Sequence, residues 1–294
     1  MRISTSQTFF TNLTNIRQAQ SRYVKAQQQV TTGRRFERLS EDPLAGQQVL
    51  NARRLRQRIE QFDANLRHAD EYTGLTETTL GEVSNLLQRA HVLAINGAND
   101  TNDGNAREAM ATEIQEIQRR LVDLGNTRST TGGYIFSGQD SKTEAFVVSG
   151  STLTYQGDDL PVSIEHRAGE TLRINLQNAE TVWSQAYTAL ENLKNHLRSG
   201  QSSLISDTDV PALQAARQVV DQARGDAGIR AQTVAFQREQ NQRRMDELTA
   251  TIGEAQDVDL AEAISRLNLA ETAYTAALQT TARGSQLSLM DFLR

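Results

Sequence analysis

The sequence predicts a mainly α-helical fold of long antiparallel hairpins with a small central antiparallel β insert, and three observations point to it. The 294 residues contain only 3 Pro and 5% aromatic residues, with a mean hydropathy of -0.55. Apolar residues near both ends recur at alternating steps of three and four positions, the period of a long helix. Between residues 132 and 176 the pattern changes to short alternating runs punctuated by Gly and Pro, which indicates strands. Because the hydrophobic content of 37% is low for one compact core, we expect an elongated molecule.

Each end of the chain is predicted to form one long helix, and the two helices are expected to pair. The first helix has the spaced residues Phe9, Leu13, Ile16, Gln20, Tyr23, Gln27 and Val30, and Gly33 follows as a C-terminal cap. The second has Leu260, Ile264, Leu267, Glu271, Tyr274 and Leu278. Since both sets include polar members, each helix should be marginal alone, and we expect protease to remove residues before about 40 and after about 255 from the monomer.

The C-terminal helix has a second line of residues that is offset from the first. This line contains Leu269, Ala273, Ala276 and Thr280. Two lines on one helix indicate more than one neighbour and hence assembly. The alternative is that the alanines only raise helix propensity.

The helices between the two ends are interrupted by clear stop and start signals. Asp42 and Pro43 form an N-cap and first-turn pair, with Ser40 as a competing cap. From there an uninterrupted apolar stripe predicts a helix over residues 43–97. Turn residues at 96–105 then predict a return into a third helix. After the β insert, further helices are expected over 182–197 and 211–252.

The residues required for catalysis or metal binding are not assembled in this sequence. There is no cysteine, the four histidines are scattered singly, and no nucleotide-binding, zinc-protease or serine-hydrolase motif occurs. The Asn- and Asp-rich loop at 96–105 fails as a calcium site because Thr101 and Met110 fall where an EF-hand needs ligands. We therefore expect no enzyme activity, no cofactor and no metal.

Charge and hydropathy also bear on the partners. Residues 1–60 have 11 basic and 4 acidic side chains, but their arginines follow helices without interleaved aromatic residues, so we expect no nucleic-acid binding. A solvated helix face, or one that meets an acidic partner helix such as the C-terminal one, is the better interpretation. No apolar run of 18 residues occurs, so no membrane contact is expected, and the first residues lack the apolar core of a cleaved signal peptide.

Several separated motifs give the chain a family resemblance. These are MRIST at the start, TTGRR to SEDPLAG, GGYIFSG with TYQGDD, and the C-terminal stretch from DVDLAEAISRLNLAETAYTAALQTTARGSQ to LSLMDFLR. In this combination and order, the sequence resembles the flagellar hook-associated protein 3 family, which is flagellin-related. The resemblance runs over the whole chain.

The resemblance implies a structural protein of the bacterial flagellum, extracellular at the hook-filament junction. It would be exported from the cytoplasm without cleavage through the flagellar type III apparatus. The implied partners are further copies in a ring, hook-associated protein 1 on the hook side and flagellin on the filament side. A cytosolic export chaperone would hold the C-terminal segment before secretion.

The resemblance also implies four structural parts. Residues 1–32 with 258–294 would form an inner terminal coiled coil, with joints at 33–42 and 253–257. Residues 43–131 with 180–252 would form a helical rod, and 132–179 a small β domain. The expected assembly interface contains Leu13, Ile16, Gln20, Tyr23, Gln27, Val30, Leu260, Ile264, Leu267, Tyr274, Leu278, Leu289 and Phe292. The expected joint between layers contains Gly33, Arg34, Arg35, Arg38, Asp42 and Pro43, whose arginines would touch neighbouring subunits or simply be solvated.

Two other functions remain open from the sequence. A minor flagellin shares the terminal patterns, although the MRIST start, the SLMDFLR end and the small β insert argue against it. A cytosolic coiled-coil scaffold that is never secreted would have similar heptads.

Overall fold

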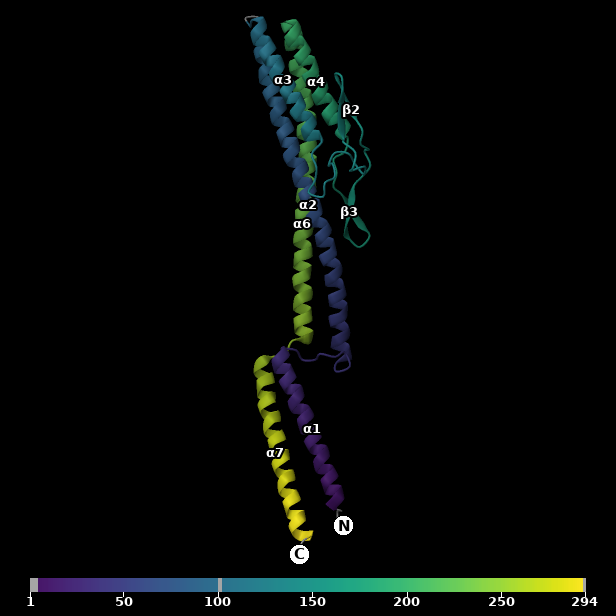
Figure 1. The fold of residues 1–294 in the computed structure, drawn as a ribbon, viewed down its shortest axis with the longest axis vertical. Helices are drawn as coiled ribbons and strands as arrows, with labels where there is room; N and C mark the ends of the chain where they lie inside the picture. The colour runs from purple at the N-terminus through teal and green to yellow at the C-terminus, as the bar shows by residue number, and fades with distance from the viewer. Residues whose placement is uncertain (1–4, 100–101, 293–294) are drawn as a thin grey trace. The chain divides into compact units, whose positions relative to one another are not determined.

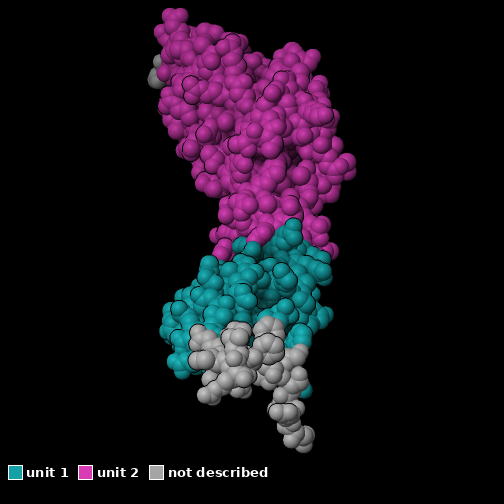
Figure 2. Space-filling view, turned by 60° about the horizontal axis from the view of Figure 1, so that its bottom comes forward, with its two compact units in different colours: residues 1–58, 244–294 teal, residues 59–243 magenta. Residues whose placement is uncertain are grey.

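A computed structural model describes residues 5–99 and 102–292, with side chains described at residue 7 and within 10–283. The chain forms two compact units, one of residues 1–58 with 244–294 and one of residues 59–243 (Figure 2). Both boundaries fall inside long helices, α2 (Pro43–Gly97) and α6 (Val210–Gln256). The predicted mainly α-helical fold with a small β insert is confirmed.

The first unit is built from the two terminal helices and the adjoining ends of α2 and α6. Helix α1 (Thr5–Thr32) lies beside α7 (Leu260–Phe292) (Figure 1). A small apolar cluster of Phe36, Ala45 and Val49 packs against Ile252 and Ala255. This cluster lies next to residues 33–42, which the sequence predicted to be a joint.

The second unit combines α3 (Gly104–Gly125) and α4 (Ala179–Ser199) with the remaining lengths of α2 and α6. Its core consists mainly of aliphatic side chains on all four helices, among them Leu66, Leu87, Ile114, Leu190 and Val220. Gly200 ends α4 in the left-handed conformation. A short helix, α5 (Ser202–Leu204), and a π-helical turn, η1 (Ile205–Asp209), then lead into α6.

The β insert forms two separate hairpins in place of one small sheet. Strands β1 (Phe146–Ser149) and β2 (Thr152–Tyr155) pair antiparallel, as do β3 (Ser163–Arg167) and β4 (Glu170–Arg173). The link between them contains Gly157 and Pro161, and proline cannot donate a ladder hydrogen bond. In the described residues the two ladders form separate two-stranded sheets.

A tryptophan on α4 fixes the insert to the helices. Trp183 is fully buried, with ring centroids 4.3 Å from Phe136 and 5.2 Å from Phe146. Its indole N–H donates to the Leu121 carbonyl at 3.0 Å. The ring thus contacts both the insert and α3, and its one polar atom is satisfied.

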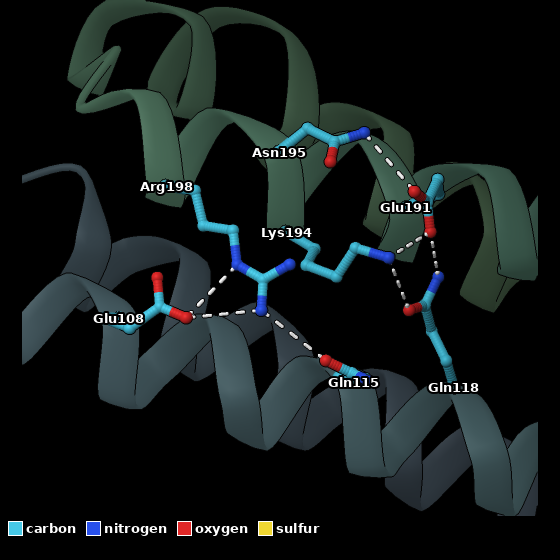
Figure 3. Close-up of polar contacts among 7 residues, drawn as sticks. All are labelled: Glu108, Gln115, Gln118, Glu191, Lys194, Asn195 and Arg198. Carbon is cyan, nitrogen blue, oxygen red and sulfur yellow. Dashed lines mark hydrogen bonds and ion pairs between the residues drawn. The ribbon is translucent and has the colours of Figure 1, made fainter. Parts of the chain in front are cut away.

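Polar contacts fix the position of α3 against α4 (Figure 3). The Lys194 ammonium lies 2.5 Å from Glu191 Oε2, and the Gln118 amide donates to the same oxygen at 2.9 Å. Burial alone would raise the pKa of Glu191, but these hydrogen bonds outweigh it and lower that pKa. Arg198 pairs with Glu108 at 3.2 Å on the more exposed side.

Candidate assembly interface

The contact between α1 and α7 uses a continuous line of apolar and small side chains, called here the pairing face. On α1 it consists of Ile16, Ala19, Tyr23, Ala26 and Val30, and on α7 of Ala263, Leu267, Ala270, Tyr274 and Ala277. Ala26 is 6% exposed and Ala263 is 0% exposed. The small alanines let the helices approach closely, and spacings of three and four keep them together.

The structure divides the residues that were predicted for this interface. Part of the set lies on the side where the two helices meet, namely Leu13, Ile16, Tyr23, Val30, Leu267 and Tyr274. Gln20 and Gln27 are exposed, and their places are taken by Ala19 and Ala26, one residue earlier. The repeat of alanine at positions 19 and 26, seven residues apart, was the signal in the sequence that could have indicated the buried line.

Other predicted interface residues of α7 point away from α1. Leu260, Ile264 and Leu278 are exposed, and Leu269 on another side of the helix is 72% exposed. Leu289 and Phe292 lie outside the described side chains. Helix α7 thus has a pairing face that contacts α1, a second apolar line with Leu260, Ile264 and Leu278, and a third with Leu269. The second and third lines leave apolar surface open to further neighbours.

The segment that joins α1 to α2 is held by backbone hydrogen bonds. Gly33 has φ +67° and ends α1 in the left-handed conformation, which glycine adopts at no steric cost. Its carbonyl accepts from Val258 N–H at 3.0 Å, and Arg35 N–H donates to the Gln256 carbonyl at 2.7 Å. The end of α1 is therefore tied to the end of α6 and to the link between α6 and α7.

The start of α2 depends on Asp42, as predicted from its place before Pro43. Asp42 Oδ1 accepts the Ala45 N–H at 3.1 Å as an N-cap, and Oδ2 lies 3.0 Å from the Arg35 guanidinium. Arg35 thus has a partner within its own chain. Arg34 and Arg38 are exposed, without a recorded side-chain partner among the described residues.

Two residues in and around this segment, Gln256 at the end of α6 and Phe36, were missed by the sequence reasoning. Gln256 is almost fully buried, and its side-chain oxygen accepts from the Arg53 guanidinium at 2.7 Å. Phe36 is 4% exposed within the small cluster of the first unit. The distance of 203 residues between Arg53 and Gln256 left no local signal for their pairing.

Among the described residues, no three His, Cys, Asp or Glu side chains come close enough together to hold a metal ion. No helix in the described ranges has both the length and the apolar character needed to cross a bilayer. His196 Nδ1 lies 2.8 Å from Asp209 Oδ2, and burial raises the pKa of Asp209.

Comparisons with known proteins agree with a flagellar origin. The bacterial flagellin N-terminal helical region matches residues 3–141. Flagellar hook-associated protein 3 of Salmonella typhimurium is 27% identical over 214 residues, covering 73% of this chain and 67% of the relative. The Escherichia coli protein of that name is 30% identical over 146 residues, covering 50% of this chain and 46% of its own length.

Solved structures and flagellins are also similar to this chain. A putative flagellar hook-associated protein from Vibrio parahaemolyticus superposes with a TM-score of 0.64 at 20% identity, over 74% of this chain and 100% of that one, so the fold is shared. Several flagellins also match, with 28% to 49% of their own lengths covered. The chain is therefore similar over most of its length to flagellar hook-associated protein 3, and over residues 3–141 to the N-terminal helical region of flagellin.

Proposed function

We propose that this chain is a structural subunit of the hook-filament junction, where copies of it form a ring on which flagellin polymerises. The observation that supports this proposal is the apolar surface of α7 beyond its pairing face, above all Leu269. Among the described residues of the first unit, α1 is the element that packs along α7. Neighbouring copies would cover it, and burial would offset the entropy of fixing the terminal helices.

The proposed partners follow from that position in the flagellum. Hook-associated protein 1 would contact the ring on the hook side and flagellin on the filament side. Before export, a cytosolic chaperone would cover the C-terminal segment. In this proposal the protein acts outside the cell and has no catalytic role.

Electron microscopy of a deletion strain, with flagellin assayed in its medium, tests the proposal. We expect bare hooks and unpolymerised flagellin in the medium, because no surface remains on which the filament can start. Restoring the gene should restore filaments. Normal filaments in the deletion strain would contradict the proposal and favour a redundant minor flagellin or a scaffold outside the flagellum.

A further inference from the structure

A groove of about 700 Å³ lies within the second unit, beside α2 and the β insert. Its wall includes His68 and Tyr72 of α2, several residues between 128 and 142, and Val162, Ile164 and Ile174 of the second hairpin region. This volume falls within the range of about 300–1,000 Å³ that is typical of small-ligand sites. Nothing in the assembly function accounts for it.

The charges of the wall have one sign. Arg128 and Lys142 line the groove together with His68, and none of its lining residues is Asp or Glu. Glu71 and Glu144 lie next to the wall, where they accept hydrogen bonds from the Thr130 N–H at 3.3 Å and the Tyr134 hydroxyl at 3.1 Å. Arg128 is therefore linked to Glu144 through the Tyr134 hydroxyl, whereas no recorded carboxylate pairs with Lys142 among the described residues.

The two cationic groups of the wall, Arg128 and Lys142, differ in how firmly they are held. The Arg128 guanidinium lies 4.4 Å from the Tyr134 ring centroid and donates to the Tyr134 hydroxyl, so it is fixed in place. Lys142 and His68 are exposed, with no recorded hydrogen bond or ion pair among the described residues. A bound anion could thus gain one fixed cation, Arg128, and one adaptable cation, Lys142, with the His68 imidazole as a further hydrogen-bonding group.

The remaining wall is amphipathic. Val162, Ile164 and Ile174 give an apolar surface, and the hydroxyls of Ser129 and Ser141 lie on the same groove. A ligand that matches both features has a carboxylate, a ring with one apolar C–H face, and hydroxyls at its edge. We propose that the groove binds an acidic sugar, which has all three.

Ligand-observed NMR titrations of the full chain at low salt test this proposal with three probes. D-glucuronate should bind, whereas D-glucose, which lacks the carboxylate, and acetate, which lacks the ring, should bind at least about tenfold more weakly. Equal binding of acetate and glucuronate would overturn the assignment to a sugar and leave a nonspecific anion site. No binding of glucuronate would overturn it entirely.

Matched variants test the location of the site. Lys142→Gln removes an exposed cation from the groove and should weaken glucuronate binding about tenfold. Arg120→Gln removes an exposed cation of the same unit that is not in the groove wall, and binding should be unchanged. Equal loss in both variants would show that the protein's net charge, and not this groove, attracts the ligand.

Discussion

The Tyr23 ring of α1 stacks on the Tyr274 ring of α7, with centroids 6.0 Å apart and an interplanar angle of 11°. These are the largest side chains of a pairing face that otherwise contains many alanines. Aromatic pairs of this kind contribute about 0.5–1.5 kcal/mol beyond their burial. The stack is therefore a principal specific contact between the two ends of the chain.

A double-mutant cycle should detect this contact in the monomer. We expect Tyr23→Ala and Tyr274→Ala each to weaken the pairing of α1 with α7, with a coupling energy of about 1 kcal/mol. Hydrogen exchange of the α7 amides would measure it. Gln279→Ala, at an exposed position of α7, is the control and should leave exchange unchanged. Additive effects of the two tyrosine substitutions would contradict the importance of the stack.

Limited trypsin digestion should distinguish the terminal helices from the second unit. Arg17, Arg22 and Arg266 are exposed on helices whose pairing face buries few large side chains, so we expect cleavage there first. Arg120 is equally exposed, but α3 belongs to the larger core and should be cut far later. Full protection of both ends would contradict the marginal stability expected of the isolated pair.

Gly33→Ala should destabilise the first unit by about 1 kcal/mol, because the left-handed conformation at φ +67° is costly for a residue with a Cβ. No atom lies within 4 Å of the added Cβ, so the cost is that of the backbone alone. Gly74→Ala is the matched control, since its site in α2 is equally open but helical, and it should stabilise by up to about 1 kcal/mol. Thermal unfolding should show these opposite signs, and equal signs would contradict the argument.

The stability of the α3–α4 contact should depend on pH through Glu191. The pKa of Glu191 is lowered from the ordinary value of 4.5. The stabilisation that the ionised side chain gives to the fold is therefore fully present above about pH 4.5 and is lost as the pH falls through the pKa of the folded state. Glu191→Gln should therefore cost about 2 kcal/mol at pH 7 and progressively less in more acidic solution. Urea unfolding at pH 7 and below pH 4 would measure both.

The control for this pH dependence is Glu116→Gln. Glu116 pairs with Arg119 on the exposed surface of α3, where ion pairs contribute little, so the variant should unfold like the parent at both pH values. A Glu191→Gln penalty that is the same at every pH would show that the lost contact is steric and not electrostatic.

The limits of the helices could be predicted because their signals are local. Gly33 supplies a left-handed residue, and Asp42 before Pro43 supplies a cap, so both ends of the segment follow from neighbouring residues. The start of α2 at Pro43 agrees with the sequence for this reason. The division of the β insert into two hairpins could not be predicted in this way, since their separation depends on how each packs against the helices.

The residues that face each other between α1 and α7 could be predicted only in part. Leu13, Tyr23 and Tyr274 are large and stand out, but a line through Gln20 differs by only one position from a line through Ala19. A helix advances by about 100° per residue, so such neighbouring lines are not resolved by hydrophobicity alone. Which line is buried depends on how closely the two backbones approach, a property of the pair.

If α7 takes part in assembly, a single substitution on its exposed side should block filament formation without changing the stability of the monomer. Leu269→Glu places a charge on an apolar residue that is 72% exposed in the monomer, so its free energy of unfolding should change little. In the ring the same charge would be buried against a neighbour, and filament formation in a complemented deletion strain should fail. Gln279→Glu adds the same charge on a polar side of α7 and should support filaments. If Leu269→Glu also supports normal filaments, that side of α7 faces solvent in the flagellum and the apolar surface has another use.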